Sequence, residues 1–232
     1  MAEQKDHVMK VSEAVDRRLS VRAYQDKPVE TAVILDVLQR AARAPSGGNL
    51  QPWRVAVLNG KRMEEFRAMM ESRIAGGDPR KGGDSAEYRV YPSDLKEPYR
   101  SSRFKVGEDM YALLGIARED RAARLKWFAN NFRFFGAPSA IFCFVDRQMG
   151  PPQWSDLGMF LQTFMLLLQE EGLDSCAQEC WSMYPQTVQE FCAMPEDLML
   201  FCGIAIGYRD ETAPVNALRS EREPLETWVK VV

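Results

Sequence analysis

The most constraining feature of this sequence is a stretch from Ser155 to Glu171 that would be apolar around most of a helix. A helix that is apolar on nearly every side has to be covered by other elements, so the spacing predicts a central buried helix. Asp156 is the better signal for its start, and Gly172 is typical of a helix end. The apolar positions are Leu157, Phe160, Leu161, Phe164, Leu167 and Leu168.

The rest of the chain alternates between helical and extended patterns. Apolar residues at helical spacing predict helices, and short apolar runs bounded by turn residues predict strands. The predicted helices cover 11–18, 31–44, 61–74, two segments within 108–131, and 184–192, and the predicted strands cover 54–59, 139–145, 173–181, 200–208 and 228–232. The sequence contains no internal repeat.

Residues 76–105 break this regular alternation. Glycines and prolines interrupt a charged stretch that also carries Tyr88, Tyr91 and Tyr99. Loops longer than about 15 residues within compact domains are commonly functional or disordered. The aromatic residues favour a functional lid, and the alternative is a mobile insertion without a role.

Length and composition favour one domain, residues 1–232. Hydrophobic residues make up 46% of the chain, which is enough for a sizeable core. No apolar run approaches the roughly 20 residues that span a bilayer. Residues 1–10 are polar and lack the apolar region and cleavage site of a signal peptide. We therefore expect a cytoplasmic protein with no membrane association.

Charge and reactive side chains exclude several classes of function. A net charge of −3 argues against nucleic-acid binding, which needs a basic face. The 5 cysteines are scattered through apolar segments, which favours buried reduced thiols over disulfides. The single histidine, His7, argues against Ser-His-Asp or Cys-His catalysis and against a metal site. An enzyme of this kind would draw its chemistry from a cofactor.

The segment 17–22 is a candidate anion site. Arg17, Arg18 and Arg22 lie around Ser20 in the sequence. Forked guanidinium donors together with a hydroxyl group suit a doubly charged phosphate. The alternative is a solvated helix end, because arginines in a last turn also complement the helix dipole.

The segment 44–53 is a candidate site for a planar ligand. Its Gly47-Gly48 turn can bring backbone N–H groups close to a ligand, and Asn49 and Gln51 offer amides to a heterocycle. The alternative is a tight connection into the strand that follows. Together with the arginine cluster, this segment suits a nucleotide-like cofactor.

These two segments, in this order and spacing, resemble the nitroreductase family of FMN-dependent oxidoreductases. Residues 203–208 resemble a late strand of that family, and residues 216–225 resemble its closing arm, which contacts phosphate. The likeness covers essentially the whole chain from about residue 10. It points to the subgroup with a long middle insertion that reduces nitroaromatic compounds.

The resemblance implies a set of FMN contacts. It places the phosphate and ribityl chain on Arg17, Arg18, Ser20, Arg22, Arg219 and Arg222, and the isoalloxazine ring along Pro45, Ser46, Asn49 and Gln51, near Asn131, with backbone N–H groups of Ala177, Gln178 and Glu179 at N5. Asn130 is an equal alternative to Asn131. The family often has glycine near 177–179, so the N–H group that faces N5 stays open. No side chain is expected to be catalytic and no metal is expected, because the flavin carries the hydride.

The lid supplies candidate substrate contacts under the same resemblance. Tyr88, Tyr91, Tyr99 and Phe104 would stack on an aromatic substrate, and Arg103 would meet a nitro group. The alternative for the aromatic residues is a small core within the lid itself.

The family likeness also implies the fold, the assembly and the reaction. We expect an α+β fold with a mostly antiparallel central sheet flanked by helices, in a domain-exchanged homodimer that swaps a C-terminal arm at 212–232. The apolar tail 228–232 would otherwise be an exposed edge. In a ping-pong reaction, NADH or NADPH would reduce FMN, which would then reduce an electron-poor acceptor.

Three alternatives remain at this stage. Within the family, the chain could be a reductive dehalogenase of halogenated aromatics. It could instead bind flavin without turnover, or it could be an ordinary interaction domain without a chromophore. Neither the physiological acceptor nor the choice between NADH and NADPH follows from the sequence.

Overall fold

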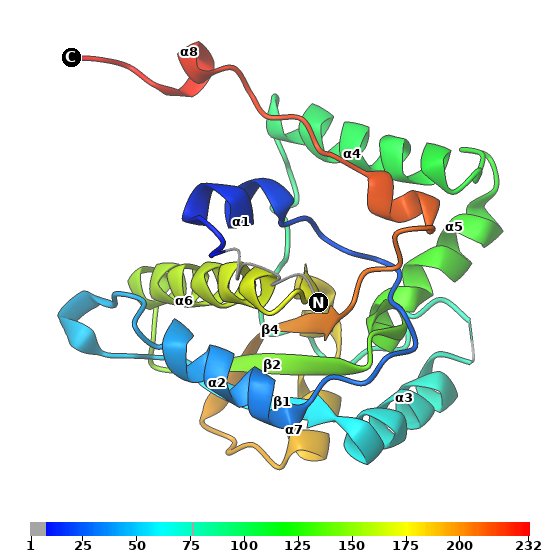
Figure 1. Cartoon of the computed structure of the whole chain (residues 1–232). Coiled ribbons are helices and arrows are strands. Elements are labelled where there is room, and N and C mark those ends of the chain that lie inside the picture. Colours follow the sequence, from blue (N-terminus) through cyan, green and yellow to red (C-terminus); the bar gives the residue numbers. More distant parts are fainter. Residues whose placement is uncertain (1–7, 76) are drawn as a thin grey trace, which may run out of the picture.

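The computed structural model describes residues 8–75 and 77–232, so His7 lies outside the described residues. A four-stranded sheet with the order β1-β2-β4-β3 forms the centre of the molecule (Figure 1). Its strands are β1 (Arg54–Asn59), β2 (Ser139–Asp146), β3 (Asp174–Gln178) and β4 (Leu198–Gly207). Every pairing in the sheet is antiparallel, which confirms the expected mixture of helices with an antiparallel sheet.

Eight α-helices and four 3-10 helices are present in the described part of the chain. The α-helices are α1 (Val11–Arg17), α2 (Thr31–Ala41), α3 (Gly60–Ile74), α4 (Tyr99–Leu113), α5 (Arg121–Phe128), α6 (Pro151–Glu170), α7 (Pro185–Cys192) and α8 (Leu225–Trp228). The 3-10 helices are η1 (Gly47–Asn49), η2 (Ala129–Gly136), η3 (Glu179–Met183) and η4 (Pro214–Ala217).

Strand β2 is covered on both faces, which explains its continuous apolar sequence. Phe142 and Phe144 belong to a core formed with α3, α7 and η2, whereas Ile141 and Cys143 belong to a second core formed with α2 and α6. Successive side chains of a strand point to opposite faces, so a strand between two cores must be apolar at every position. The helices accordingly lie on either side of the sheet (Figure 1).

Helix α6 begins earlier than its composition suggests. Gly150 is the N-cap, and Pro151 opens the helix. The expectation that Asp156 marks the start was wrong, because a proline at the first helical position already suits the start of a helix. Helix α6 is covered toward the sheet and α2, yet Met159 is 39% exposed, so one side of the helix remains open.

The segment that we expected to be a lid is fastened to the body at several points. The Tyr184 hydroxyl donates to the Pro79 carbonyl at 2.7 Å, and Asp84 accepts from the backbone N–H of Thr187 at 2.7 Å. Farther along, Arg147 pairs with Glu87 at 2.6 Å. From Tyr99 onward the expected loop is helical, because α4 begins there.

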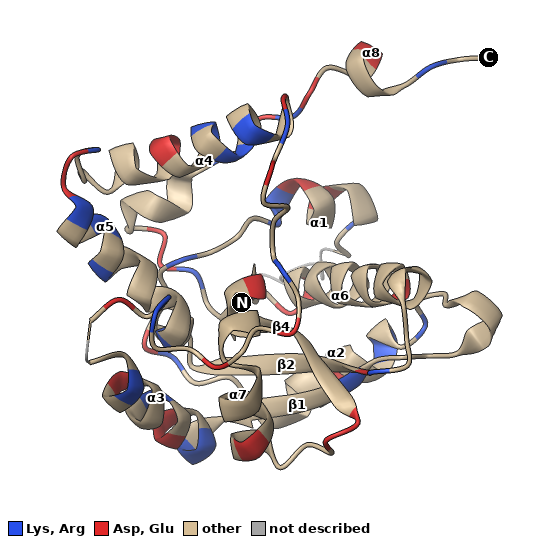
Figure 2. Cartoon of the chain, turned by 180° about the vertical axis from the view of Figure 1, so that it is seen from behind, with Lys and Arg blue, Asp and Glu red and all other residues tan. Residues whose placement is uncertain are grey.

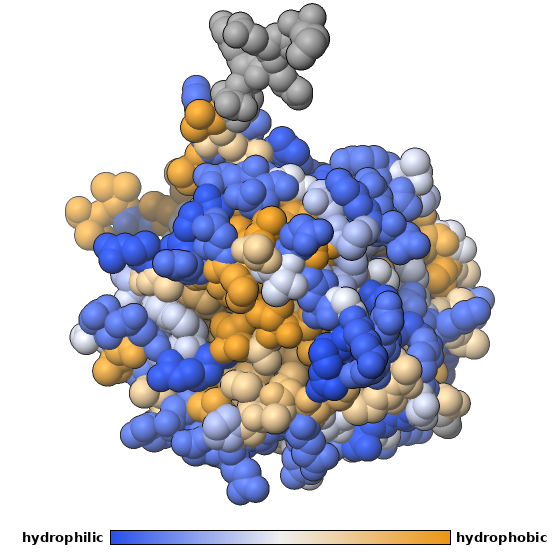
Figure 3. All heavy atoms as spheres, turned by 60° about the horizontal axis from the view of Figure 1, so that its bottom comes forward, coloured by the Kyte–Doolittle hydropathy of each residue, from blue (hydrophilic) through white to orange (hydrophobic). Residues whose placement is uncertain are grey.

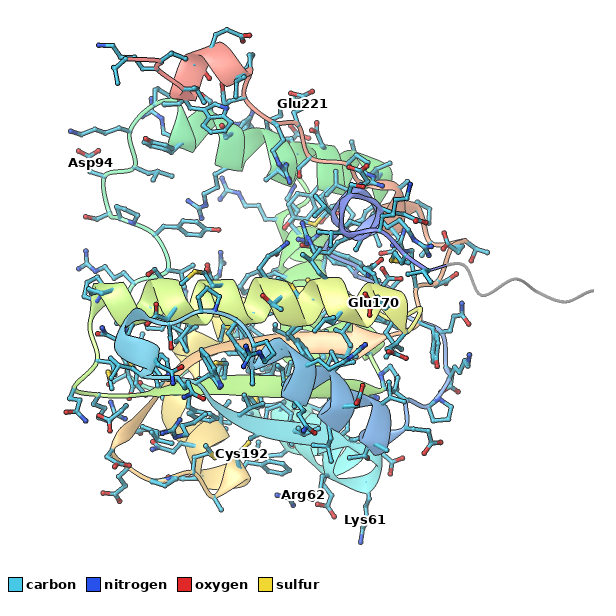
Figure 4. The ribbon with its side chains drawn as sticks, turned by 60° about the vertical axis from the view of Figure 1, so that its left-hand side comes forward. Lys61, Arg62, Asp94, Glu170, Cys192 and Glu221 are labelled. Atoms are coloured by element: carbon cyan, nitrogen blue, oxygen red, sulfur yellow. The ribbon has the colours of Figure 1, made fainter. Side chains whose placement is uncertain are left out.

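The C-terminal arm runs along α4 and then leaves the body (Figure 1). Glu221, on the arm, lies beside α4 (Figure 4), and its carboxylate is 3.4 Å from Lys105 Nζ. The predicted strand at 228–232 was wrong for this chain, since only the short helix α8 forms there. A strand needs a partner edge, and in this chain Trp228 is 69% exposed and Val232 is fully exposed.

Surface charge follows the outer helices. Helices α3 and α4 carry residues of both signs, whereas the ribbons of β1 and β2 are almost free of charge (Figure 2). An apolar area surrounded by hydrophilic residues is exposed on the lower face (Figure 3). No helix in the described ranges is long and apolar enough to cross a membrane.

Candidate functional site

A small cavity of about 180 Å³ gathers the arginines from both ends of the chain. Its polar lining comes from four arginines and two serines, and no carboxylate lines it within the described part of the chain. The lining residues are Arg18, Leu19, Ser20, Arg22, Val106, Leu218, Arg219, Ser220 and Arg222. Guanidinium groups and hydroxyls without a carboxylate form a cradle for an anion. We refer to Arg18, Ser20, Arg22, Arg219 and Arg222 as the anion cradle.

The sheet fixes the first half of the anion cradle. Helix α1 ends at Arg17, and Arg18 has extended backbone angles, φ −61° and ψ 125°. Ser20 then forms a parallel bridge with Ser175 of β3, and the Val21 N–H donates to the Ser175 carbonyl at 3.0 Å. The chain therefore changes from helix to an added strand at the point where Arg18 and Ser20 enter the cavity.

Asn216 joins the second half to the first. Its side-chain oxygen accepts from the Arg22 N–H at 2.8 Å, and its side-chain nitrogen donates to the Ala23 carbonyl at 2.8 Å. Asn216 is buried, so this clasp holds the arm against the segment that carries Arg22. Sequence reasoning noted Asn216 as the start of the arm, but nothing in the local pattern revealed the clasp.

The like charges of the arginines in the anion cradle repel one another. Burial lowers the pKa of Arg18, and the like charges of Arg222 and Arg219 lower it further. Within the described ranges none of these three forms an ion pair with a carboxylate. Arg219 Nη1 donates to the Asp16 carbonyl at 2.5 Å, and Arg222 Nη1 to the Ser220 carbonyl at 3.0 Å. A bound anion would relieve this repulsion.

Arg17 does not join the anion cradle. Its guanidinium lies 4.0 Å from Glu13 on its own helix. It lines a neighbouring cavity of about 260 Å³, which also contains Asp174 and Arg209. Arg17 is therefore the one arginine of the predicted phosphate site that does not line the cavity of the anion cradle.

Arg22 also lines a larger cavity of about 500 Å³. Its lining includes Trp127 and Asn130. Asn131 does not line it, because its side chain donates to the Phe128 carbonyl at 2.9 Å and accepts from Gln178 Nε2 at 3.3 Å. Of the two asparagines that the sequence left open, Asn130 faces a cavity and Asn131 fastens β3.

The segment 45–51 lies away from the anion cradle. The Gly47 N–H donates to both carboxylate oxygens of Asp156, at 3.2 and 3.3 Å, near the start of α6. The anion cradle is joined to β3, which follows the end of the same helix. The part of α6 from Asp156 to Glu170 is about 21 Å long. One chain therefore does not bring the two predicted halves together, and the ribbon shows them apart (Figure 1).

Within this segment the backbone is preorganised. Asn49 and Gln51 adopt left-handed angles, with φ of 57° and 49°. The Gln51 N–H donates to the Ser46 hydroxyl at 3.0 Å, and Gln51 Nε2 donates to the Asn49 carbonyl at 3.2 Å. Pro45 and Asn49 are exposed. Left-handed non-glycine residues are uncommon and concentrate at ligand sites.

Strand β3 presents buried polar atoms that lack a partner. Gln178 Oε1 and Ser175 Oγ are buried without a hydrogen bond, and so is the hydroxyl of Tyr24, which lies outside the strand. Such orphaned atoms are rare in folded proteins, and bound ligands are one way of satisfying them. Next to Gln178, Ala177 and Glu179 are exposed, and burial raises the pKa of the Glu179 carboxyl.

The structure does not gather the predicted substrate residues. The Tyr88 hydroxyl donates to the Phe201 carbonyl, and its ring packs against that of Phe201, with centroids 6.3 Å apart. Tyr99 is exposed at the start of α4. The rings of Tyr91 and Phe104 each have a guanidinium group over them. Arg103 lies over Tyr91 at 4.0 Å, and Arg118 lies over Phe104 at 5.0 Å.

The next groups to consider are the cysteines and possible metal ligands. All 5 cysteines are free, as the sequence predicted, and burial raises the pKa of Cys143 to about 12. Within residues 8–75 and 77–232, no group of three or more histidine, cysteine, aspartate or glutamate side chains could hold a metal.

Comparison with known proteins decides the family. The model of the nitroreductase family matches residues 15–208, which is most of the chain. The chain belongs to the nitroreductase family. Among curated relatives, a 4-nitrobenzoate reductase from Pseudomonas putida is 35% identical over 210 residues, covering 90% of this chain and 89% of that protein. A nitrobenzene nitroreductase from Ectopseudomonas oleovorans is 31% identical and covers 96% of each chain.

Solved nitroreductases have the same fold. The FMN and NADPH-dependent nitroreductase NfnB from Sphigopyxis sp. strain HMH is 48% identical, with a TM-score of 0.91 over 97% of this chain and 99% of that one. NfnB from Mycobacterium smegmatis, solved in complex with NADPH, is 28% identical, with a TM-score of 0.87 over 96% and 100% of the two chains. These similarities confirm the family that the two polar segments and the arm resembled.

Proposed function

We propose that this nitroreductase binds FMN and transfers electrons from NADH or NADPH to nitroaromatic acceptors in the cytoplasm. The observation that carries the proposal is the anion cradle, which lies in a chain whose relatives reduce nitroaromatic compounds. When bound, FMN supplies a ring that takes hydride from the nicotinamide and passes it to the acceptor. The protein holds that ring and controls what reaches it.

The anion cradle would hold the FMN phosphate. Arg18, Ser20 and Arg22 would bind it from the segment after α1, and Arg219 and Arg222 from the arm. The donor set fits a phosphate monoester, because guanidinium groups without a carboxylate partner are available at a cavity of suitable size. Arg17 would act only through its place at the end of α1.

The ring would require a second copy of the chain. Pro45, Ser46, Asn49 and Gln51 lie apart from the anion cradle of their own chain, because the part of α6 from Asp156 to its end at Glu170, about 21 Å long, lies between them. A homodimer that sets this segment beside the partner's anion cradle would complete the site. The open side of α6 at Met159 and the departing C-terminal arm support such an assembly.

The end of β3 would meet the edge of the ring. We place Ala177, Gln178 and Glu179 there, near Asn131 and with Asn130 facing the adjacent cavity. The unpartnered Gln178 Oε1 supports this placement, since a ring N–H would satisfy it. Backbone N–H groups in this stretch would donate to N5 of the oxidised ring, the atom that takes up and gives hydride.

The chain would act as one domain with two functional appendages. Residues 76–105 would form the acceptor lid, in which Tyr91, Tyr99, Phe104 and Arg103 contribute surface and Tyr88 fastens the lid to β4. Residues 212–232 would form the exchanged arm. Contacts of Asp84 with Thr187 and of Glu87 with Arg147 hold the first part of this segment against the body.

The decisive test is the absorption spectrum of the purified protein, recorded without oxygen before and after adding NADH and then NADPH. A flavin spectrum that bleaches, with turnover on 4-nitrobenzoate or nitrobenzene, supports the proposal. A halophenol assayed in parallel separates nitroreduction from dehalogenation. A protein that neither carries nor takes up FMN would refute it.

The phosphate assignment has its own test. The double variant Arg18→Met with Arg222→Met should lose retained FMN, whereas Arg121→Met, an exposed arginine of α5, should keep it. Stoichiometric FMN in the double variant would show that the phosphate binds elsewhere.

A further inference from the structure

A nearly buried ion pair lies behind the anion cradle without lining it. Arg209 Nη2 lies 2.6 Å from Asp174 Oδ1, and Arg209 Nε lies 3.1 Å from Asp174 Oδ2. The two side chains are only 16% and 11% exposed. Gln169 Nε2 also donates to Asp174 Oδ1 at 3.2 Å. This two-pronged pairing fixes the plane of the guanidinium group.

The same guanidinium reaches the segment that carries the anion cradle. Arg209 Nη2 donates to the Arg17 carbonyl at 3.2 Å, at the last residue of α1. The next fixed point is the Ser20 bridge to Ser175, the neighbour of Asp174 in β3. The backbone between Arg17 and Ser20 is thus attached to β3 at both ends, directly at Ser175 and through the Arg209 guanidinium at Asp174.

An attachment of this kind is needed because the anion cradle repels itself. Arg18 lies between these two fixed points, and the like charges of Arg219 and Arg222 act against it. Without an anion, repulsion would favour a spread arrangement of the guanidinium groups. A backbone fixed on both sides of Arg18 limits how far that arginine can retreat.

We propose that the Asp174–Arg209 pair is a positioning device for the anion cradle, which sets where the Arg18 guanidinium and the Ser20 hydroxyl meet a phosphate monoester. The proposal rests on the proposed function, since FMN is the phosphate monoester concerned. Arg209 acts through the Arg17 carbonyl and is a positioning residue. Its effect therefore depends on the ligand's phosphate group.

Riboflavin separates this role from a general structural one, because it has the same ring and ribityl chain as FMN but no phosphate. An ion pair that only stabilises the fold would affect both ligands equally. Loss of a pair that positions the anion cradle weakens the binding of FMN and leaves the binding of riboflavin nearly unchanged. The quantity to measure is the ratio of the two dissociation constants.

The experiment titrates the flavin-free dimer with FMN and with riboflavin, following the quenching of flavin fluorescence. Arg209→Met should raise the Kd for FMN by about tenfold or more and change that for riboflavin by less than about twofold. Arg209→Lys should recover part of the FMN affinity, because an ammonium keeps the charge but not the two-pronged geometry. If Arg209→Met does not fold, Arg209→Lys carries the test with the same ratio.

Arg147→Met is the matched control. Arg147 also bridges a carboxylate and a backbone carbonyl, with Nη2 2.6 Å from Glu87 and Nε 2.7 Å from the Glu196 carbonyl. It lies next to the start of β4, whereas Arg209 follows the end of that strand. It should leave the ratio of the two constants unchanged. Equal losses of FMN and riboflavin affinity in Arg209→Met, or no loss of either, would overturn the proposal.

A double-mutant cycle adds a second readout. In an Arg18→Met background, Arg209→Met should raise the Kd for FMN by a clearly smaller factor than in the unaltered chain, because one of the two groups that it positions is gone. Additive losses would contradict action through Arg18. Failure of the proposed function is a different outcome, in which the unaltered protein itself binds neither flavin.

Discussion

Gly47 and Asp156, which lie 109 residues apart in the sequence, are joined by a backbone N–H that donates to both carboxylate oxygens at 3.2 and 3.3 Å. This contact attaches the segment 45–51 to the second turn of α6. It sets the position of Ser46 and Asn49, which the proposed dimer would bring to the partner's flavin ring. The long apolar helix thereby orients the segment that is expected to face the ring.

Removing this contact should make the segment 45–51 less firmly held against α6. Asp156→Ala should lower the free energy of unfolding by about 1–2 kcal/mol, since it leaves the Gly47 N–H without its acceptor. Asp156→Ala should also raise the Kd for FMN and the Kd for riboflavin by a similar factor of about ten, because both ligands carry the ring. Urea unfolding and fluorescence titration measure the two effects. Asp156→Asn keeps an acceptor oxygen and is the control; an FMN-selective loss in Asp156→Ala would contradict the assignment.

Two adjacent glycines test how the lid's first part is docked. A Cβ on Gly83 would lie 2.4 Å from the Met183 carbonyl oxygen, whereas a Cβ on Gly82 would lie 3.9 Å from its nearest neighbours. Gly83→Ala should therefore cost about 1–3 kcal/mol of unfolding free energy. Gly82→Ala should stay within about 0.5 kcal/mol of the original. Equal unfolding midpoints in urea for the two variants would show that residues 77–88 are not held against η3.

Local pattern predicted the elements of the fold well. The spacing of Leu157, Phe160 and Phe164 gave the long helix, and the apolar run from Ser139 to Val145 gave the central strand, because burial imposes these periods on the sequence. It failed where the outcome depends on distant partners. Asp156 is a good N-cap by type, yet a backbone N–H from η1 uses its carboxylate.

Part of the candidate site was indicated by the sequence, and FMN binding there stays a prediction. Arginine spacing indicated Arg18 and Arg22, since an anion needs several guanidinium groups close together. The contact of Arg209 with Asp174 could not be predicted from the sequence, because it arises from the pairing of β3 with β4 and the return of the chain past Tyr24. Sequence order also gave no sign that α6 separates the two polar segments.

The thiols should be nearly inert in the native protein. Burial raises the pKa of Cys143 from 9.0 to about 12, so at pH 8 its thiolate fraction is about 1000-fold below that of an unburied thiol. Burial raises the pKa of Cys176 and Cys202 in the same direction. A disulfide-exchange reagent at pH 8 should react slowly before urea is added and with 5 thiols afterwards. Ser101→Cys, at an exposed position of α4, should add one rapidly reacting thiol; a comparable rate in the unaltered native protein would contradict the burial.

The C-terminal arm provides the sharpest test of assembly. Leu225 is 58% exposed and Trp228 is 69% exposed in the single chain, so each presents apolar surface without a partner there. If the arm is exchanged, deleting residues 225–232 should raise the dimer dissociation constant by about 100-fold or more, because buried aromatic anchors dominate interface energies. Light scattering coupled to size-exclusion chromatography measures the mass across a dilution series.

Trp228→Phe separates a specific anchor from a general loss of apolar area, since it keeps a ring in the same place and should retain most of the association. FMN retention should fall together with dimer content in the deletion variant, because in the proposed dimer the ring side of the site comes from the second chain. A deletion variant that remains dimeric and keeps its flavin would show that α6 and its neighbours suffice for assembly. A monomer that keeps full FMN affinity would show that one chain completes the site, and would contradict the placement of residues 45–51 on the partner's flavin.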